Sequence, residues 1–426
     1  MPAKRSNTMS RVGLASLVGT TIEYYDFAVY GTAAALVLGP AFFPSEDATL
    51  SSMAAFLTFS VAFLARPVGV VLFGTIGDRF GRKRALVASL VLMGAATFGV
   101  GLLPTYESAG IIAPVLLVVL RLLQGVSLGG EWGGAVLLAA EHAPAGRRAL
   151  FTSIPQAGPP LGFLLSNAVI LPTLAIAGRE RFADGAWRVP FLLSSVLVIL
   201  GFWIRTHVAE SPVFSDKSAA RKAPSFPLAT LIREYPKRMV LGIGAAVGGS
   251  AVYYLALVYS LSYGPTLGIP QPTMLTATSV AAAGGILAIV PAARLADRVG
   301  RRPVMLVGTV GCALWSMPMF GTLSSGNAVL ITGSFTIGLV LLALIFCPIA
   351  AFLPELFPTH LRYTGVSVTF IIANTLGGGF GPLVATWLNT QWQSPLAIGI
   401  YTGGLCLVGV GCVLALPETR GQDFGI

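Results

Sequence analysis

The sequence GDRFGRK at residues 77–83 follows one long apolar segment, and the similar sequence ADRVGRR at residues 296–302 follows another, about half of the chain away. The sequence EHAPAGRR at 141–148 likewise shares the positions of its Glu, Pro and final Arg with ELFPTHLR at 355–362. Two pairs of similar sequences, separated by nearly the same number of residues, indicate an internal duplication. Parallel repeats around a central cavity are a design found in transporters.

The composition of the 426-residue chain is typical of a membrane protein. Apolar residues make up 55% of it and charged residues 10%, and its mean hydropathy is +0.80. A soluble globular chain carries about 25% charged residues. This composition excludes a soluble enzyme, a nucleic-acid-binding protein and a disordered scaffold. The uninterrupted apolar runs also exclude an outer-membrane barrel, whose strands alternate apolar and polar residues.

The apolar segments predict an all-α polytopic membrane protein with twelve transmembrane helices in two pseudo-symmetric six-helix bundles. We expect an N-terminal bundle at 1–206, a cytoplasmic linker at 207–238 and a C-terminal bundle at 239–426. The linker contains prolines and an excess of basic residues, and part of it is expected to be helical on the membrane surface. The expected spans are 13–39, 50–76, 84–104, 111–140, 149–175, 188–206, 239–265, 273–293, 303–324, 327–352, 363–389 and 394–416.

The basic residues predict the orientation of these helices in the membrane. Most of them lie in alternating hydrophilic breaks, and short loops rich in Lys and Arg stay in the cytoplasm. Both termini are therefore predicted to be cytoplasmic, in a multi-pass protein of the cell membrane. The net charge of +10 then reflects topology and not a nucleic-acid partner. No signal-peptide cleavage pattern follows the basic N-terminus, so the first span is expected to be retained.

The cysteines and histidines predict no cofactor. All four cysteines lie inside apolar spans, and the three histidines lie in hydrophilic breaks without the spacing of metal ligands. The chain also contains no GxxxxGK[ST] sequence, which argues against transport driven by ATP.

The repeated loops are interpreted as a gate on the cytoplasmic side. Their glycines permit a tight turn, and their acidic and basic side chains can pair across the two halves and bias one conformation against another. The alternative is that the charges only anchor the topology. The residues assigned to the gate are Gly77, Asp78, Arg79, Gly81, Arg82, Glu141, Arg148, Asp297, Arg298, Gly300, Arg301, Glu355 and Arg362.

The acidic and basic side chains that lie away from the ends of the predicted spans all belong to the first half: Glu23, Asp26, Arg66, Arg121 and Glu131. Each costs about 2.5–3.5 kcal/mol at a helix centre, so they are expected to face a wet cavity and to pair. A carboxylate whose arginine partner comes and goes can act as a proton switch. We predict Asp26 as the proton carrier with Arg121 as its partner. Glu23 and Glu131 are the competing carriers, and a static charge network is the structural alternative.

The two intramembrane arginines also predict the chemistry of the cargo, because a guanidinium binds a carboxylate through paired hydrogen bonds. We expect Arg66 to bind a substrate carboxylate, while Arg121 moves between Asp26 and the substrate. Tyr24, Tyr25 and Tyr30 flank the acidic pair. The further candidates for substrate contact are Tyr25, Gln124, Trp132, Gln156, Tyr254 and Asn374, and helix packing is the alternative role for each of them.

Four motifs resemble a known family. GTIGDRFGRKRAL at 74–86 and RLLQGVSLGGEWGGA at 121–135 resemble signatures of the major facilitator superfamily. IEYYDFAVYG at 22–31 and PELFPTHLRYTG at 354–365 are similar to its metabolite:proton symporter family. GGEWGGA, the FFP sequence after the first span and Gln156 look most like the shikimate transporter branch.

The resemblance implies twelve helices and alternating access, and we expect a functional monomer. The resemblance also implies proton-coupled import of small carboxylates or zwitterions, such as shikimate, 2-oxoglutarate, citrate, proline and betaine. A shikimate-like hydroxy acid or a dicarboxylate is the favoured cargo, and a zwitterion is the alternative.

Other functions fit the sequence less well. GPPLG at 158–162 partly matches an antiporter motif of exporters, but an exporter of cations has little use for two arginines in its cavity. An enzyme within the membrane would need a nucleophile or a metal-binding set, and the spans contain no HExxH sequence. A ligand sensor that does not transport is a further alternative, although no signalling domain is attached. We therefore predict a transporter and not an enzyme.

Overall fold

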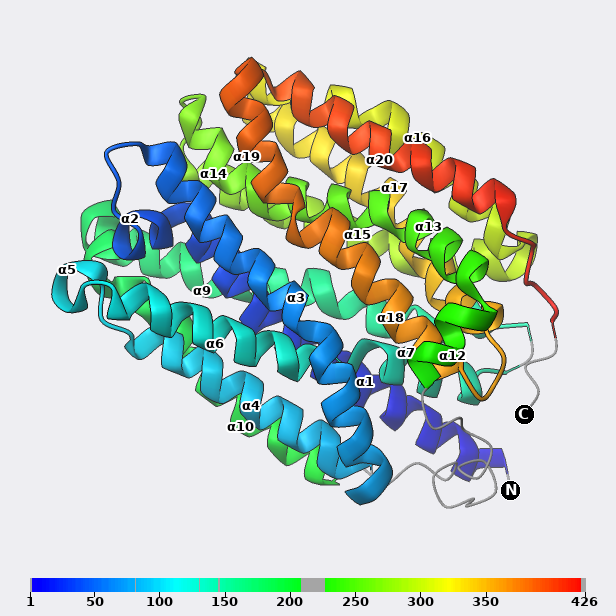
Figure 1. The fold of residues 1–426 in the computed structure, drawn as a ribbon. Helices are drawn as coiled ribbons and strands as arrows, with labels where there is room; N and C mark the ends of the chain where they lie inside the picture. The colour runs from blue at the N-terminus through cyan, green and yellow to red at the C-terminus, as the bar shows by residue number, and fades with distance from the viewer. Residues whose placement is uncertain (1, 81, 130, 145, 208–226, 423–426) are drawn as a thin grey trace.

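The protein is all-α in a computed structural model that describes residues 2–80, 82–129, 131–144, 146–207 and 227–422 (Figure 1). The first half contains α1 (Pro2–Ala33), η1 (Ala34–Leu38), α2 (Gly39–Phe42), α3 (Ala48–Phe80), α4 (Arg82–Leu102), α5 (Tyr106–Ala109), α6 (Ile112–Leu128), α7 (Glu131–His142), α8 (Arg148–Thr152), η2 (Pro155–Ala157), α9 (Gly158–Arg181), η3 (Phe182–Ala186) and α10 (Arg188–His207).

The second half follows the same plan. It contains α12 (Pro227–Glu234), α13 (Pro236–Tyr254), η5 (Leu255–Tyr259), α14 (Ser260–Thr266), α15 (Gln271–Val299), α16 (Arg301–Gly321), η6 (Thr322–Ser325), α17 (Ala328–Leu356), α18 (Arg362–Asn374), η7 (Thr375–Gly379), α19 (Gly381–Trp392) and α20 (Pro395–Ala415).

The twelve predicted spans correspond to these helices. Within the described ranges, 9 helical stretches are long and apolar enough to cross a membrane, and Val87–Leu102 and Arg188–Trp203 are shorter apolar helices. With α1 they make up the twelve helices of the predicted fold. Helix α1 begins at Pro2, well before the expected start at residue 13, because no glycine or further proline interrupts the basic segment that follows.

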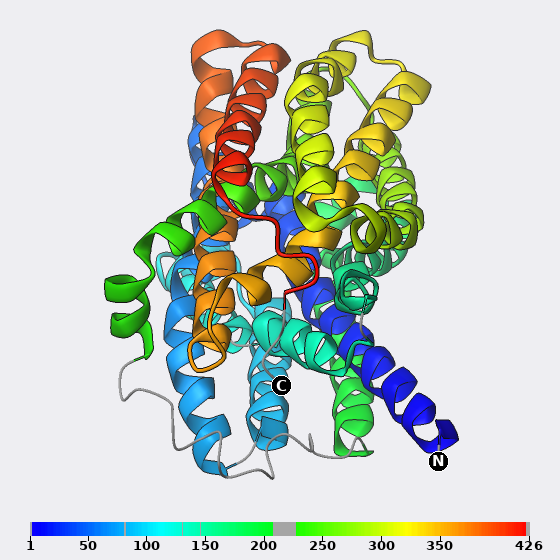
Figure 2. The same ribbon diagram turned by 90° about the vertical axis from the view of Figure 1, so that its right-hand side faces the viewer.

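The helices form two bundles that lie side by side (Figures 1 and 2). In the first bundle α1 packs on α9, α4 on α10 and α3 on α6; in the second α15 packs on α17 and α16 on α20. Across the interface α9 contacts α15, α8 contacts α17, α7 contacts α18 and α3 contacts α19. The start of α1, helix α12 and the end of the described chain lie at one end of the molecule, which we call the basic end. Helices α2, α5 and α14 lie at the other end (Figure 1).

Several of the long helices are interrupted within the described residues, and the interruptions after α1 and α13 occupy corresponding places in the two bundles. Turns of π-helix follow α1 at Ala34–Leu38 and α13 at Leu255–Tyr259. A 3-10 turn precedes α9 at Pro155–Ala157, and a π-turn follows α18 at Thr375–Gly379. Such turns are rare in helices and are frequent at functional sites, so these positions mark places where the helices can bend.

The repeated loop is a sharp turn at the basic end. In the second copy α15 ends at Val299, α16 begins at Arg301, and Gly300 between them has a φ of 121°, which favours glycine. The Glu418 carboxylate accepts hydrogen bonds from the backbone N–H groups of Arg301 (3.0 Å) and Arg302 (2.9 Å) and so caps α16. In the first copy Gly81, which separates α3 from α4, lies outside the described residues.

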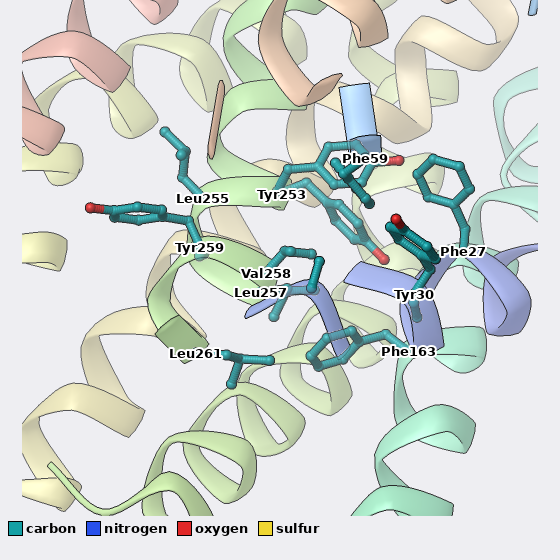
Figure 3. Close-up of a cluster of buried hydrophobic side chains, with 14 of the residues drawn as sticks. Phe27, Tyr30, Phe59, Phe163, Tyr253, Leu255, Leu257, Val258, Tyr259 and Leu261 are labelled. Atoms are coloured by element: carbon teal, nitrogen blue, oxygen red, sulfur yellow. The ribbon is translucent and has the colours of Figure 1, made fainter. Parts of the chain in front are cut away.

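The hydrophobic core is continuous across the interface between the bundles. One cluster of buried side chains contains Phe27 and Phe59 of the first bundle together with Tyr253 and Tyr254 of the second. Figure 3 shows Phe27, Tyr30 and Phe59 gathered beside Tyr253. The predicted site residues of α1 and α3 therefore lie close to the interface.

Candidate transport site

Arg121 lies in the centre of the first bundle and is held by three hydrogen bonds. It is 0% exposed, and its Nη1 donates to Gln124 Oε1 at 2.7 Å. Its Nη2 donates to the Phe59 carbonyl at 3.2 Å and its Nε to the Thr58 carbonyl at 3.4 Å. Its guanidinium carbon also lies 3.7 Å from the centre of the Tyr30 ring, a cation–π contact. Nearby acceptors and an aromatic face thus fix the orientation of the guanidinium.

Asp26 is also 0% exposed, but its surroundings differ from the expected ones. Neither of its carboxyl oxygens accepts a hydrogen bond from the described part of the chain. The predicted Asp26–Arg121 ion pair is therefore not formed in this conformation. The physical reason is that the donors of Arg121 are directed to Gln124 and to two carbonyl groups of α3.

Thr97 of α4 links these two side chains and was not among the predicted site residues. Gln124 Nε2 donates to Thr97 Oγ1 at 2.8 Å, and Thr97 Oγ1 donates to the Met93 carbonyl at 3.0 Å. The hydroxyl lies beside the Asp26 carboxyl without a hydrogen bond of normal geometry. A buried polar chain therefore runs from Arg121 through Gln124 and Thr97 to the side of Asp26. A single threonine in an apolar span carries no sequence signal for this role.

Arg66 of α3 is the second buried cation, at 5% exposure, and it faces the second bundle. Its guanidinium carbon lies 4.1 Å from the centre of the Phe63 ring and 4.8 Å from that of Phe27. The Tyr254 phenol of α13 lies beside it without a hydrogen bond of normal geometry. Arg66 Nε has no hydrogen-bond partner among the described residues, which leaves this donor available to a ligand.

Adjacent tyrosines of α1 point in different directions. Tyr24 lines a cavity between the bundles. Tyr25 instead donates its hydroxyl to the Pro190 carbonyl of α10 at 2.8 Å and packs inside the first bundle. The prediction that Tyr25 contacts the substrate is not supported, because successive helical residues differ by about 100° in direction. Glu23 is buried at the same level of α1, and the side chain of Glu131 lies outside the described residues.

The cavity lies between the two bundles and has a volume of about 60 Å³. One buried water needs about 10–15 Å³ of cavity volume, so the cavity has room for only a few waters in this conformation. Of the predicted substrate contacts, Gln156, Tyr254 and Asn374 line it. The full lining is Tyr24, Gln156, Pro159, Pro160, Tyr253, Tyr254, Gly285, Ile289, Leu339, Leu342, Ala343, Phe346, Cys347, Phe370 and Asn374.

Trp132 connects the bundles between this cavity and the basic end and does not line the cavity. Its ring stacks on Phe370 of the second bundle, with ring centres 3.4 Å apart and planes 9° apart. Trp132 Nε1 donates to Gln156 Oε1 at 2.9 Å, and Gln156 Nε2 donates to the Phe346 carbonyl at 2.9 Å. The oxygen and the nitrogen of the Gln156 amide thus both form hydrogen bonds. The bundles are joined on the side of the cavity that faces the basic end.

Ionic and polar contacts join the bundles at the basic end. Arg148 Nη1 of α8 lies 2.7 Å from Glu355 Oε1 of α17, and Arg301 Nη2 lies 3.3 Å from the same oxygen. Arg301 Nη1 also lies 3.2 Å from Asp297 Oδ1. The Asp297 carboxylate accepts hydrogen bonds from the backbone N–H groups of Ala149 (2.9 Å) and Leu150 (3.0 Å) in the first bundle. These contacts join the two bundles at the basic end in this conformation.

The other predicted gate residues take different positions. Thr419, which was not predicted, donates its hydroxyl to Glu355 Oε2. Arg362 Nε donates to the Pro354 carbonyl at 3.0 Å and lies near Glu141, and Arg298 is exposed. The side chains of the first loop copy lie outside the described residues: Gly77, Asp78, Arg79, Gly81 and Arg82. A gating role stays a prediction for all of these residues.

Comparison with known proteins identifies the family. A family model described as Major Facilitator Superfamily matches residues 17–382. The chain is 41% identical over 424 residues to the inner membrane metabolite transport protein YhjE of Escherichia coli (strain K12), covering 98% of this chain and 96% of that protein. It is 35% identical over 421 residues to the shikimate transporter of the same organism, covering 96% of this chain and 95% of that transporter.

A solved structure is similar in fold. The proton:xylose symporter XylE bound to 6-bromo-6-deoxy-D-glucose has a TM-score of 0.74 with this structure, at 19% identity, over 99% of this chain and 98% of that chain. At this identity the likeness supports the fold alone. Its agreement with the sequence matches leads to one conclusion: the chain belongs to the major facilitator superfamily and is a multi-pass membrane transporter of metabolites, not an enzyme.

Proposed function

We propose that the protein is a proton-coupled symporter that imports a small carboxylate by alternating access, with Asp26 as the proton carrier. The observation that carries this proposal is the fully buried Asp26 carboxyl, whose two oxygens accept no hydrogen bond from the described residues. An ionised carboxylate in such a place is very costly, whereas the neutral acid is tolerated. We therefore assign this conformation to the protonated state of Asp26.

Loss of the proton would change the balance of charges within the first bundle. The negative charge on Asp26 would attract the Arg121 guanidinium away from Gln124 and from the carbonyl groups of α3. The Gln124–Thr97 pair lies between the two groups and would have to rearrange with them. Since Arg121 also touches Tyr30 and Phe59, its movement would be felt by side chains that border the interface. This is how proton release would be coupled to a change of conformation.

Arg66 is the proposed anchor for the carboxylate of the cargo. It is buried, it lies beside Tyr254 of the opposite bundle, and its Nε donates no hydrogen bond to a described residue. A carboxylate bound there would contact both bundles at once. The cavity of about 60 Å³ is too small for a metabolite, so binding would require the bundles to separate at one end. The ionic contacts at the basic end are the ones that would break during release to the cytoplasm.

The two guanidiniums also argue against the alternative cargoes. A betaine or an exported lipophilic cation would bring a positive charge close to Arg66 and Arg121, where burial strengthens the repulsion. A shikimate-like hydroxy acid and a dicarboxylate both provide the anion that these arginines favour. Glu23 and Glu131 are the other candidate proton carriers, and the test below separates them from Asp26.

The test uses liposomes that contain purified protein and a pH-sensitive dye. Shikimate, 2-oxoglutarate, citrate, proline, betaine and cyclohex-1-ene-1-carboxylate are added separately to the outside. Protein-free liposomes give the baseline for passive entry of the acids. Above this baseline we expect internal acidification with at least one carboxylate, none with Asp26→Asn, and the unmodified level with the control Asp184→Asn, which changes an exposed carboxylate. Acidification that survives in Asp26→Asn would move the proton to Glu23 or Glu131. Alkalinisation during efflux of a preloaded lipophilic cation, with no response to the other compounds, would support an exporter instead.

A further inference from the structure

We propose that the cargo is a monocarboxylic acid with an apolar body, such as a cyclic or branched hydrocarbon acid. The proposal rests on the function proposed above, in which Arg66 binds a carboxylate. It is carried by the uneven distribution of polar groups around the cavity: they gather near Arg66, whereas the opposite wall is apolar.

The polar side of the cavity is formed by tyrosines of α1 and α13, and Arg66 of α3 lies close to these tyrosines without lining the cavity itself. The phenols of Tyr24 and Tyr254 line the cavity, and both interact electrostatically with Arg66. Tyr253 lies next to Tyr254, with ring centres 5.0 Å apart. One guanidinium and these hydroxyl groups supply enough donors for the two oxygens of a single carboxylate. A ligand held there would direct the rest of its body away from α1 and α3.

The opposite wall belongs to α15 and α17. The side chains that line it are Ile289, Leu339, Leu342, Ala343 and Phe346. Residues 239–293 and 303–354, which contain this wall, include no Asp, Glu, Lys or Arg. These two segments therefore offer no cation that could bind a second carboxylate of the cargo.

The two amides at the margin of the cavity are largely engaged. Gln156 uses its oxygen to accept from Trp132 and its nitrogen to donate to the Phe346 carbonyl. Asn374 donates its amide nitrogen to the Phe370 carbonyl of its own helix at 3.0 Å. A single hydroxyl group near this margin could still donate to Asn374 Oδ1, but hydroxyl groups placed against the apolar wall would remain without a partner, and unpaired buried hydroxyls are unfavourable.

This arrangement separates close chemical relatives. Shikimate is the trihydroxylated form of cyclohex-1-ene-1-carboxylate, so the two acids share a ring and a carboxylate and differ only in three hydroxyl groups. An apolar pocket discriminates against one added hydroxyl by about a hundredfold, so we expect at least about tenfold weaker binding of shikimate after partial compensation. Glutarate would need a second cation at the apolar wall, and betaine would place its ammonium near Arg66.

The experiment measures binding of cyclohex-1-ene-1-carboxylate, shikimate, glutarate and betaine to the purified full-length protein by isothermal titration calorimetry. We expect the hydrocarbon acid to bind at least about tenfold more tightly than each of the others. Shikimate or glutarate binding equally well or better would overturn the proposal, as would failure of all four compounds to bind. Tight binding of the hydrocarbon acid without proton movement in liposomes would support this inference and contradict the proton-coupled function.

A variant of the wall provides a second readout. Leu342→Asn adds a hydrogen-bonding group to the apolar wall, so the preference for the hydrocarbon acid over shikimate is expected to fall about tenfold. The matched control is Leu330→Asn, which changes an exposed leucine at the start of the same helix and should leave the preference unchanged. An unchanged preference in a folded Leu342→Asn protein would contradict the assignment of this wall to the cargo. The comparison of ligands on the unmodified protein tests the proposal even where this variant does not fold.

Discussion

At the scale of single residues, the chemistry of the first bundle depends on where two guanidiniums and one carboxyl find partners. Arg121 has three acceptors and an aromatic ring, whereas Asp26 has no hydrogen bond from the described residues. Charge pairs attract strongly at low dielectric, so under the proposed function a proton on Asp26 maintains this separation. Residues that set the distance between the two groups should therefore affect coupling as strongly as the groups themselves.

Thr97 is the clearest case of such a positioning residue. Thr97→Val keeps the shape of the side chain but removes the acceptor of the Gln124 amide, which leaves a buried donor unpaired. An unpaired buried donor costs about 1–3 kcal/mol, so we expect proton-coupled uptake to fall by about tenfold to a hundredfold and its pH profile to shift. Thr97→Ser restores the hydroxyl and should restore both properties. A Val variant with the unmodified rate and pH profile would exclude this role.

Arg66 gives a prediction for the carboxylate anchor. Arg66→Gln removes the charge, and a hydrogen bond to a charged group contributes about 1.5–3 kcal/mol, so affinity for cyclohex-1-ene-1-carboxylate should fall by about tenfold to a hundredfold. Arg66→Lys keeps the positive charge but cannot form the paired hydrogen bonds of a guanidinium. Its affinity for the acid should therefore lie between those of the unmodified protein and Arg66→Gln. Calorimetry on variants with unchanged thermal unfolding provides the measurement, and Arg179→Gln, at an exposed site, is the control. Equal affinity in Arg66→Gln would place the carboxylate elsewhere.

At the scale of helices, close approach between the bundles depends on small residues. A Cβ atom on Gly133 of α7 would overlap with Ser367 Oγ of α18, whereas one on the adjacent Gly134 would meet its nearest atom at an ordinary 3.8 Å. The stacked pair of Trp132 and Phe370 lies next to this contact. The tight fit of α7 against α18 is therefore one of the contacts that join the bundles on the side of the basic end.

Gly133→Ala should therefore open the basic end, because the added methyl group cannot be accommodated while the bundles are closed. Spin labels at Arg147→Cys and His360→Cys, in exposed loops of opposite bundles, would report a longer distance in this variant. Gly134→Ala is the matched control and should leave the distance unchanged. The double variant Gly133→Ala/Ser367→Gly should restore the short distance. A short distance in Gly133→Ala alone would show that this contact does not limit closure.

At this scale the long helices could be predicted from the sequence, whereas their interruptions could not. The existence of the long apolar helices could be predicted, because twenty apolar residues in succession are an unambiguous signal. The π-turns at Ala34–Leu38 and Leu255–Tyr259 could not be predicted, since neither segment contains a glycine or a proline that would mark it. Their matching places in the two halves were visible only in the structure.

At the scale of the whole molecule, the repeated loops and the distribution of charge predicted two bundles and a shared basic end. The site was harder to predict, because partners are chosen by helix rotation and packing. Tyr24 reaches the cavity while Tyr25 points to α10, and Arg121 binds Gln124 instead of Asp26. Charge alone was enough to select the candidate residues in the membrane, but it did not predict their contacts or the neutral Thr97.

The orientation of the molecule in the membrane leads to a further prediction. The positive-inside rule places the basic end in the cytoplasm. A membrane-impermeant maleimide added to intact cells should label Ser325→Cys, in the exposed turn after α16 at the opposite end, and should not label Thr359→Cys at the basic end. Opening the cells should make Thr359→Cys reactive. Labelling of Thr359→Cys in intact cells, with Ser325→Cys protected, would invert the topology.

The central claim is that a proton on Asp26 drives a carboxylate across the membrane. The most direct measurement imposes a pH gradient, alkaline inside, on liposomes and follows radiolabelled cyclohex-1-ene-1-carboxylate against an equal internal concentration, with protein-free liposomes as the baseline for passive entry of the acid. We predict that the unmodified protein accumulates the acid faster than the baseline, whereas Asp26→Asn exchanges labelled for unlabelled acid but adds nothing to gradient-driven accumulation. Accumulation by Asp26→Asn at the unmodified rate would contradict the claim.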